Sequence, residues 1–385
     1  MTAWTVLAAA LAEELTTLGK LRSPQWQAAV RAVPRHELVP VHHTVDPHSG
    51  EWTAHRTDLA LAYSNTALFV LPGGLSSTSM PGLMTRMLES LDVHDGHRVL
   101  EIGAGTGYNA ALLSHRLGDT QVFAVDLDPE LIELARDRLA RIGYHPTLVA
   151  ADGANGLPQH APYDRIIATC SVPAVPWPWV EQSRDGGLIL VDVKPGRLAG
   201  NLVLLRRDGD HAQGRFDPVY GSFMAIRRAG ETYRGTTSLA QGRADAQQRT
   251  TSLHLTRPWE HTPFWFFTHF ALPPGTSFSL RADNDDGPPT NTVLACPDGS
   301  WCEVRETVDD GTRQVWEAGG HELWRIIEDR HAAWRALGEP GWDRFGLTVT
   351  PERQWAWLDS PDGQHIWDIQ RSSRLGSAAT ASTSR

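Results

Sequence analysis

Short, nearly continuous apolar runs alternate with amphipathic stretches between residues 99 and 193. The apolar runs cover 99–102, 121–126, 147–151, 165–170 and 188–193. Runs of this length, bounded by helical patterns and turn residues, are typical of parallel strands whose two faces are both covered. The pattern therefore predicts an α/β domain of βαβ units, with its ligand site at the carboxyl ends of the strands.

Two amphipathic stretches precede this domain and predict helices at 4–18 and 24–32, the second beginning with Ser23 before Pro24. We expect the proline-bounded segment 33–40 to be extended and residues 45–54 to form a loop. A hydroxyl-rich stretch at 76–79 then leads into a predicted helix at 81–91. Taken alone, these hydroxyl groups favour a helix N-cap.

Three alternating glycines, Gly103, Gly105 and Gly107, separate the first apolar run from a helical pattern. Such glycines permit a tight turn and let a ligand approach bare backbone beside the free N–H groups of a helix N-terminus. The third glycine comes one position too early for the dinucleotide fingerprint. With Glu101 before the turn, the order E-x-G-x-G-x-G is typical of S-adenosylmethionine-dependent methyltransferases. The alternative is a tight βα connection that binds nothing.

Acidic residues end the next two strands. Asp126 comes about twenty residues after the glycine turn, where folds of this kind carry a carboxylate for a ribose. Asp128 before Pro129 is the better helix N-cap, which leaves Asp126 available to a ligand. Asp152 ends the third strand, where the methyltransferase pattern has an adenine contact. The alternative for Asp152 is an Asp-Gly turn.

Composition and charge exclude several functions. A chain of 385 residues exceeds one ordinary core and predicts two domains. The net charge of −10 argues against a nucleic-acid partner. No apolar run is long enough to span a bilayer, so no membrane partner is expected. Three cysteines without a C-x-x-C pair suit a reducing cytoplasm. The histidines at 42, 43 and 48 lack metal-site spacing and predict a solvated loop, so no metal is expected.

A polar linker is expected at 230–242, and the pattern beyond it predicts strands, including 252–256 and 265–270, with one helix at 322–337. Ten of the 15 tryptophans lie between Trp259 and Trp367. Most of them should fill the core of a small antiparallel sheet. A peptide-binding surface of exposed tryptophans is the alternative. The tail at 372–385 is expected to be disordered.

Five motifs occur in an order that resembles the protein-L-isoaspartate O-methyltransferase family. They are VPRHELVP at 33–40, AYSNTAL at 62–68, SSTSMP at 76–81, EIGAGTGYNAALL at 101–113 and ADG at 151–153. The resemblance covers about residues 20–228. It implies a Rossmann-like class I methyltransferase sheet with helices on both faces, and S-adenosyl-L-methionine as cofactor. The implied cofactor-binding residues are Glu101, Gly103, Ala104, Gly105, Gly107, Asp126, Leu127, Asp152 and Gly153.

The same resemblance implies the catalytic residues. Ser79 matches a serine that contacts the substrate carboxylate in the family, and Ser77 and Thr78 match its neighbours. Met80 and Ser76 replace glutamines of the family's loop, and Asn65 replaces an acid. A carboxylate acceptor is already ionised at neutral pH. Methyl transfer to it therefore needs orientation and desolvation rather than a general base.

The chain continues well beyond the family's catalytic domain. We expect a helical and substrate-loop region at 1–95, a cofactor-binding core at 96–229 and, after the linker, a smaller mainly β (α+β), Trp-rich substrate-recognition domain at 243–371. This layout resembles the methyltransferases that modify ATP-grasp ribosomal peptides, the graspetides. It implies esterification of an aspartate side chain in a macrocyclised precursor peptide, followed by aspartimide formation. The alternatives are an isoaspartyl protein-repair methyltransferase with an accessory domain and a non-catalytic peptide-binding module.

Overall fold

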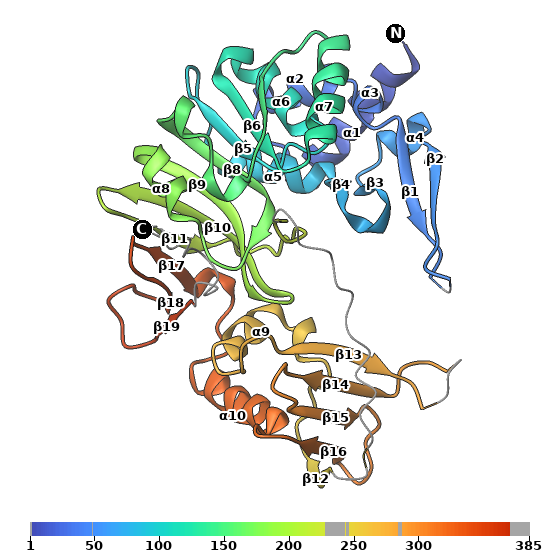
Figure 1. Ribbon diagram of the computed structural model, residues 1–385, viewed down its shortest axis with the longest axis vertical. Helices are drawn as coiled ribbons and strands as arrows, with labels where there is room; N and C mark the ends of the chain where they lie inside the picture. Colours follow the sequence, from blue (N-terminus) through green and yellow to red (C-terminus); the bar gives the residue numbers. More distant parts are fainter. Residues whose placement is uncertain (1, 48, 228–242, 244–245, 284–286, 370–385) are drawn as a thin grey trace, which may run out of the picture.

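The computed structural model describes residues 2–47, 49–227, 243, 246–283 and 287–369. Its largest element is a ten-stranded sheet with the order β19-β18-β17-β11-β10-β9-β8-β5-β6-β7 (Figure 1). The five predicted strands form the parallel part of this sheet. They are β5 (Val99–Ile102), β6 (Val122–Asp126), β7 (Thr147–Ala150), β8 (Tyr163–Val172) and β9 (Ser183–Gly196). The predicted α/β fold class is confirmed.

The rest of the large sheet is antiparallel and comes from two distant parts of the chain. After β9 come β10 (Ala199–Asp208) and β11 (His211–Phe216). The strand β17 (Phe345–Val349) then pairs with β11, and β18 (Gln354–Leu358) and β19 (Ile366–Asp368) follow it. The range expected to form one recognition domain at 243–371 is therefore divided, because its last strands extend the sheet of the cofactor-binding core. The expected linker at 230–242 and tail at 372–385 lie outside the described residues.

Helices cover both faces of the large sheet, as predicted. One face carries α1 (Ala3–Thr17), α2 (Pro24–Ala32), α5 (Pro81–Ser90), α6 (Tyr108–Leu117) and α7 (Pro129–Arg141). The other face carries α8 (Trp177–Gln182) and α9 (Thr262–His269). Two short helices, α3 (Arg35–Leu38) and α4 (Leu59–Ala62), lie between α2 and α5. The prediction of an extended segment at 33–40 was wrong, because α3 forms inside it.

A four-stranded antiparallel sheet with the order β2-β1-β3-β4 precedes α5. Its strands are β1 (Val41–Val45), β2 (Trp52–Arg56), β3 (Leu68–Leu71) and β4 (Ser76–Thr78). The prediction of a loop at 45–54 was wrong in part, since β1 and β2 form a hairpin in which Val45 lies opposite Trp52. Cross-strand packing stabilises it: the Trp52 and Phe69 rings meet edge to face, 5.2 Å between centroids.

The C-terminal region builds a second antiparallel sheet, with the order β12-β16-β15-β14-β13. Its strands are β12 (Gln247–Thr251), β13 (Ser277–Arg281), β14 (Asn291–Ala295), β15 (Trp301–Arg305) and β16 (Arg313–Ala318), followed by α10 (Leu323–Ala336). The predicted strands at 252–256 and 265–270 were wrong. The second is the helix α9, which packs against both sheets and is therefore buried on all sides (Figure 1). Such a helix lacks the polar face that reveals helical periodicity.

The ten C-terminal tryptophans serve mainly as core. Six are buried: Trp259, Trp265, Trp301, Trp324, Trp342 and Trp357. The other four, Trp316, Trp334, Trp355 and Trp367, are half-buried. Core filling is therefore the better account of this composition, and an exposed tryptophan surface is not present in the described residues.

Candidate active site

The glycine-rich turn joins β5 to α6 at the carboxyl edge of the parallel strands. All three glycines have positive φ, 93° at Gly103, 51° at Gly105 and 84° at Gly107, a region that other L-residues rarely adopt. Space is also limited. A Cβ atom on Gly103 would lie 2.8 Å from the Thr169 hydroxyl oxygen, and one on Gly107 would lie 2.9 Å from Leu139. The turn is thus a cradle of bare backbone.

Asp126 fixes this cradle to the end of β6. Its carboxylate accepts a hydrogen bond from the Gly105 N–H at 2.9 Å. The backbone N–H of Ala104 donates to the Val125 carbonyl at 3.1 Å, one residue earlier on the same strand. Asp126 and the following Leu127 are both half-buried. The carboxylate can therefore position the turn and still reach a ligand.

Asp128 is the helix cap that the sequence predicts. Its carboxylate accepts hydrogen bonds from the N–H groups of Glu130 at 3.0 Å and Leu131 at 3.3 Å, in the first turn of α7. The two neighbouring acids thus have different tasks: Asp128 caps a helix, and Asp126 faces the glycine turn.

Glu101 is enclosed beneath the cradle. One of its carboxylate oxygens accepts a hydrogen bond from the Asn109 amide at 3.0 Å, and the other has no partner among the described residues. Burial raises the pKa of Glu101 to about 8, while the Asn109 hydrogen bond opposes this rise and the nearby Asp126 adds to it. A buried carboxyl oxygen without a hydrogen-bond partner is a candidate contact for a polar group of a ligand.

Asp152 and Gly153 lie at the end of β7. The Asp152 carboxylate accepts the Ala154 N–H at 2.9 Å and caps a short 3-10 turn, as the Asp-Gly alternative expects. The residue is half-buried, and its strand pairs with β6 so that Ala150 lies opposite Asp126. Gly153 is buried, and a Cβ there would lie 2.8 Å from Ile102. The structure therefore brings all the predicted cofactor residues to one edge, with Asp152 also serving a local turn.

The strand β4, which contains the predicted catalytic residues Ser77 and Thr78 and directly precedes Ser79, lies against the glycine cradle. A Cβ atom on Gly105 would lie 3.9 Å from the Ser77 carbonyl oxygen and 4.0 Å from the Ser76 hydroxyl oxygen. Thr78 is buried and Ser79 is half-buried. In the part of the chain that the structure describes, the Ser79 hydroxyl makes no hydrogen bond, while its carbonyl accepts one from Arg35 at 3.4 Å. Its hydroxyl is therefore available to a ligand.

The N-cap interpretation of the hydroxyl cluster is wrong. The residue at the N-cap of α5 is Met80, and no side chain of the cluster bonds to the first turn of the helix. Instead the Asn65 side-chain oxygen accepts the Gly82 N–H at 2.8 Å, from a position 17 residues earlier. Asn65 thus does the capping, and the hydroxyl groups before the helix are left for another role.

Sequence reasoning missed a charged pair at the carboxyl end of β9. The Lys194 ammonium lies 2.9 Å from the Asp192 carboxylate and donates to the Ser222 hydroxyl and the Phe223 carbonyl, both at 2.6 Å. Asp192 is fully buried, accepts the Phe223 N–H at 2.8 Å, and has one oxygen without a partner in the described residues. Burial raises the pKa of Asp192, and Lys194 opposes this rise.

The signal for this pair was present in the sequence. Two charged residues, Asp192 and Lys194, end an otherwise apolar buried strand at the edge where a ligand binds.

Cys170, at the end of the neighbouring β8, is a free thiol whose pKa burial raises to about 12, so it is not a nucleophile. The described residues contain no group of three or more His, Cys, Asp or Glu residues able to hold a metal.

A nucleoside cofactor fits the arrangement of these residues. The cradle offers backbone that a single Cβ atom would block, and Asp126 offers a carboxylate for a ribose diol. Glu101 offers a buried oxygen that has no hydrogen-bond partner among the described residues. Among the described helices, none is long and apolar enough to cross a membrane.

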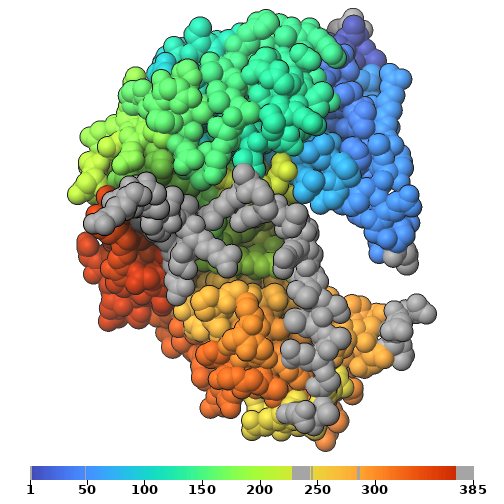
Figure 2. Space-filling view, in the orientation of Figure 1, coloured from blue at the N-terminus to red at the C-terminus, as the bar shows by residue number. Residues whose placement is uncertain are grey.

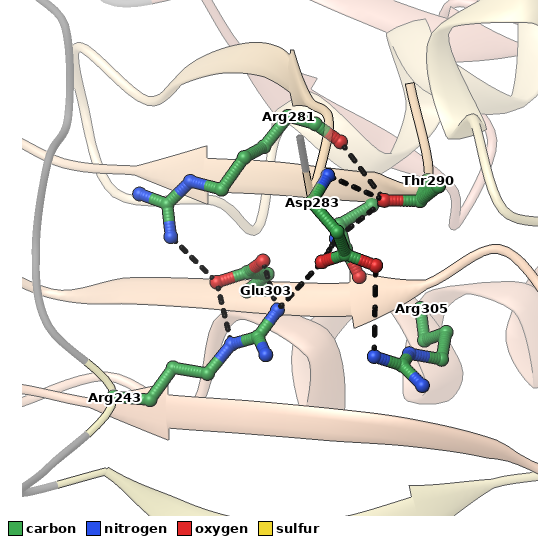
Figure 3. A network of polar contacts seen from close by, with 7 residues as sticks. Arg243, Arg281, Asp283, Thr290, Glu303 and Arg305 are labelled. Atoms are coloured by element: carbon green, nitrogen blue, oxygen red, sulfur yellow. Dashed lines mark hydrogen bonds and ion pairs between the residues drawn. The ribbon is translucent and has the colours of Figure 1, made fainter. Parts of the chain in front are cut away.

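The second sheet carries a separate charged cluster on the face away from α9 and α10. Glu303 is fully buried and accepts hydrogen bonds from Arg243 at 2.6 Å and Arg281 at 2.9 Å (Figure 3). Asp283 lies 3.9 Å from Arg243 and 3.7 Å from Arg305. The Arg243 guanidinium also lies 4.0 Å from the centre of the Trp316 ring. Three guanidinium groups thus meet two carboxylates, so most of the charge is compensated within the cluster, and the pair of Arg281 and Glu303 links β13 to β15.

Comparison with known proteins is consistent with this site. The model of the family described as protein-L-isoaspartate(D-aspartate) O-methyltransferase (PCMT) matches residues 8–217. A protein-L-isoaspartate O-methyltransferase of Methanococcoides burtonii is 38% identical over 184 residues, which cover 47% of this chain and 80% of the relative. Protein-L-isoaspartate O-methyltransferase 1 of Archaeoglobus fulgidus is 34% identical over 226 residues, 57% of this chain and 93% of the relative.

A solved structure extends the likeness to the C-terminal region. The structure titled protein-L-isoaspartate O-methyltransferase has a TM-score of 0.54 and 22% identity, and covers 92% of this chain and 100% of its own. The shared fold therefore includes most of the residues beyond the cofactor-binding core.

Proposed function

Because the chain belongs to the protein-L-isoaspartate(D-aspartate) O-methyltransferase family, we propose that it methylates the free carboxylate of an isoaspartyl residue in a polypeptide. The chain is a carboxyl O-methyltransferase, and its cofactor is S-adenosylmethionine. One observation carries the assignment of the site. The loop that begins with β4 lies against the glycine cradle, with Ser77 beside Gly105. An acceptor held by this loop would lie next to a ligand held by the cradle.

S-adenosylmethionine, when bound, supplies an electrophilic methyl group. The cradle, Asp126 and Glu101 are the residues that would hold it. A carboxylate acceptor is ionised at neutral pH and needs no general base. The chain must therefore remove water from the acceptor and orient one of its oxygens. A hydrogen bond donated by the Ser79 hydroxyl would do the second task.

Neutral donors suit this reaction better than a free cation. The negative charge of the carboxylate is lost as the ester forms, so a cation beside it would stabilise the reactant more than the transition state. Lys194 is the basic residue at the end of β9, and its charge is balanced by Asp192 at 2.9 Å. The pairing therefore keeps a lysine near this edge without an unbalanced positive charge.

A second acceptor, the aspartate side chain of a macrocyclised precursor peptide, has one observation in its favour. The loop carries Ser76 and Met80 where the family has glutamines, and Asn65 where it has an acid. Methylation of such an aspartate would yield an ester that the neighbouring backbone nitrogen attacks, releasing methanol and leaving an aspartimide. The C-terminal region does not favour this acceptor by itself, because a structure titled protein-L-isoaspartate O-methyltransferase shares its fold.

The test uses the full-length chain and four peptides of one sequence. The peptides contain either an isoaspartyl or an aspartyl residue, and each is prepared in linear and macrocyclised form. Mass spectrometry follows the gain of one methylene and any later loss of methanol. We expect methylation of the isoaspartyl peptides and none of the linear aspartyl peptide, and Gly103→Val should abolish it. Methylation of the macrocyclised aspartyl peptide alone would replace the first proposal with the second.

A further inference from the structure

Exposed apolar side chains gather on the small sheet that precedes the candidate active site. Of the fourteen large apolar residues that are exposed in the described parts of the chain, four lie between residues 41 and 75. They are Val41 and Val45, each 41% exposed, Phe69 at 39% and Leu75 at 40%. Together with the half-buried Trp52 they form what we call the apolar platform.

Strand pairing places four of these residues, Val41, Val45, Trp52 and Phe69, on one face of this sheet, and Leu75 lies outside its strands. Val45 lies opposite Trp52, and Val41 is four residues from Val45 on the same strand, so the three side chains point to the same side. His43 lies between the two valines and opposite Phe69, which adds β3 to the face. The ring contact between Trp52 and Phe69 agrees with this placement.

The platform is continuous with the loop proposed to hold the acceptor. Phe69 lies directly opposite Ser77 of β4. The turn Pro72–Gly74 packs on the same face, since a Cβ on Gly74 would lie 3.8 Å from Phe69 and 3.9 Å from Trp52. Leu75 follows this turn and directly precedes β4.

The molecule is hollowed beside this sheet. Figure 2 shows an open space between the β1–β2 hairpin and the second sheet. A polypeptide that reaches the glycine cradle from this side would pass the hairpin. The opposite wall of the hollow is the region of β13 and β14, at the end of the molecule away from α6 and α7 (Figure 1).

We propose that the apolar platform binds an apolar, extended segment of the substrate polypeptide next to its acceptor residue. The inference rests on the proposed function and names the class of substrate that the site prefers. With a small-molecule acceptor the apolar platform would stay exposed to water, which is unfavourable in free energy. A peptide with apolar side chains would cover this surface. The platform includes β3, which pairs with β4 at the start of the loop proposed to hold the acceptor. The occupant is therefore a segment of the same substrate rather than an unrelated partner.

The spacing of the strands determines which positions of the substrate peptide should carry apolar side chains. Neighbouring strands are about 4.8 Å apart, and an extended peptide advances about 3.3 Å per residue. Phe69 is one strand away from Ser77, and the valines of β1 are two strands away. Apolar residues about two to four positions from the acceptor would therefore reach the platform.

The experiment compares two isoaspartyl peptides that differ at the second to fourth positions on either side of the acceptor. One has Leu or Val there, and the other has Ser. Wild-type protein is compared with Phe69→Asn and Val45→Asn. Matched controls are Ile366→Asn, which changes a strand residue of similar exposure at 38%, and Val308→Asn, which changes an exposed valine in the connection between β15 and β16.

We expect wild-type KM for the apolar peptide to be about tenfold lower than for the Ser peptide. Phe69→Asn should raise the apolar-peptide KM about tenfold, with kcat and S-adenosylmethionine affinity unchanged, whereas the controls should leave it unchanged. Equal KM values for the two peptides in the wild type would overturn the proposal. So would an unchanged KM for the apolar peptide in both Phe69→Asn and Val45→Asn. A concentration-dependent dimer that Phe69→Asn abolishes, without a change in KM, would assign the platform to a second copy instead.

A binding measurement separates this proposal from the proposed function. Fluorescein-labelled versions of the two peptides, with Asn in place of the acceptor, are titrated and followed by anisotropy. If no acceptor is methylated but the apolar peptide still binds about tenfold more tightly than the Ser peptide, the catalytic assignment fails and the platform stands. If methylation proceeds with no such preference, the platform fails alone.

Discussion

The Lys194 ammonium and the Asp192 carboxylate lie 2.9 Å apart at the carboxyl end of β9. Asp192 is fully buried, and the Lys194 side chain is only 11% exposed. An ion pair this enclosed loses little of its strength to solvent screening, but removal of one partner leaves an unbalanced charge in the interior. It ties β9 to the segment that contains Ser222 and Phe223.

Lys194→Met should destabilise the protein by about 3 kcal/mol, because Asp192 would be left buried without its cation. Adding Asp192→Asn should restore part of this loss. Urea unfolding of both single variants and the double variant measures the coupling. As a control, Arg325→Ala removes an exposed pair with Asp329 on α10 and should cost less than about 0.5 kcal/mol. Strictly additive losses for Lys194 and Asp192 would contradict the pairing.

Asp126→Ala should weaken S-adenosylmethionine binding about tenfold or more, because it removes the proposed ribose acceptor and the bond that positions Gly105. Asp128→Ala is the matched control two residues away. It should lower stability by about 1 kcal/mol through loss of the α7 cap and leave donor affinity almost unchanged. Isothermal calorimetry and thermal unfolding measure the two effects. Wild-type donor affinity in a folded Asp126→Ala protein would remove Asp126 from the site.

Ser79→Ala should reduce kcat/KM about ten- to a hundredfold. The S-adenosylmethionine affinity and the stability should stay near wild type, because the Ser79 hydroxyl is proposed to contact only the substrate. Asn65→Ala provides the contrast. It removes the hydrogen bond to the Gly82 N–H and should cost about 1 kcal/mol of stability. Steady-state kinetics and urea unfolding separate these roles. Unchanged turnover in Ser79→Ala would exclude it from acceptor binding.

The stability of the cofactor-free protein should fall as pH rises from about 5 to about 8. Burial raises the pKa of Glu101 to about 8, so over this range the folded protein keeps a proton that the unfolded chain releases. The loss is at most about 1.4 kcal/mol per pH unit, is absent below the unfolded pKa and is complete above pH 8. Glu101→Gln should remove this component, and the exposed Glu133→Gln should not. Urea unfolding at several pH values tests it, and a constant difference between wild type and Glu101→Gln would refute it.

A chain ended at residue 229 should not give a stable catalytic domain. It would lose α9 and β17, and with them Phe266, Phe267 and Phe345, which are buried in the core of the large sheet. Each such side chain contributes about 1.5–3 kcal/mol, so the total approaches the stability of an entire domain. Circular dichroism and size-exclusion chromatography should show aggregation or non-cooperative melting. A monomeric truncated protein with a sharp transition would show that β11 tolerates a free edge.

Local sequence signals determined the core of this protein. The apolar runs between 99 and 193 gave the five parallel strands, and the spacing of Gly103, Gly105 and Gly107 indicated a ligand cradle whose positive φ angles only glycine adopts easily. The Asp128 cap was also predictable, because its hydrogen bonds reach only two and three residues ahead. In each case the residues that interact are close in the chain.

Tertiary structure alone decided the rest. Asn65, not the adjacent hydroxyl cluster, caps α5. Ala212 of β11 lies opposite Val349 of β17, so the C-terminal strands join the large ten-stranded sheet. The run at 265–270 lies mostly in α9, and because two sheets bury this helix from both sides its sequence lacks a polar face. Partners this distant in sequence leave no local periodicity. Their contacts depend on which strand edge or helix end the folded core leaves unpaired. Residues distant in sequence reach these positions only when the tertiary structure forms.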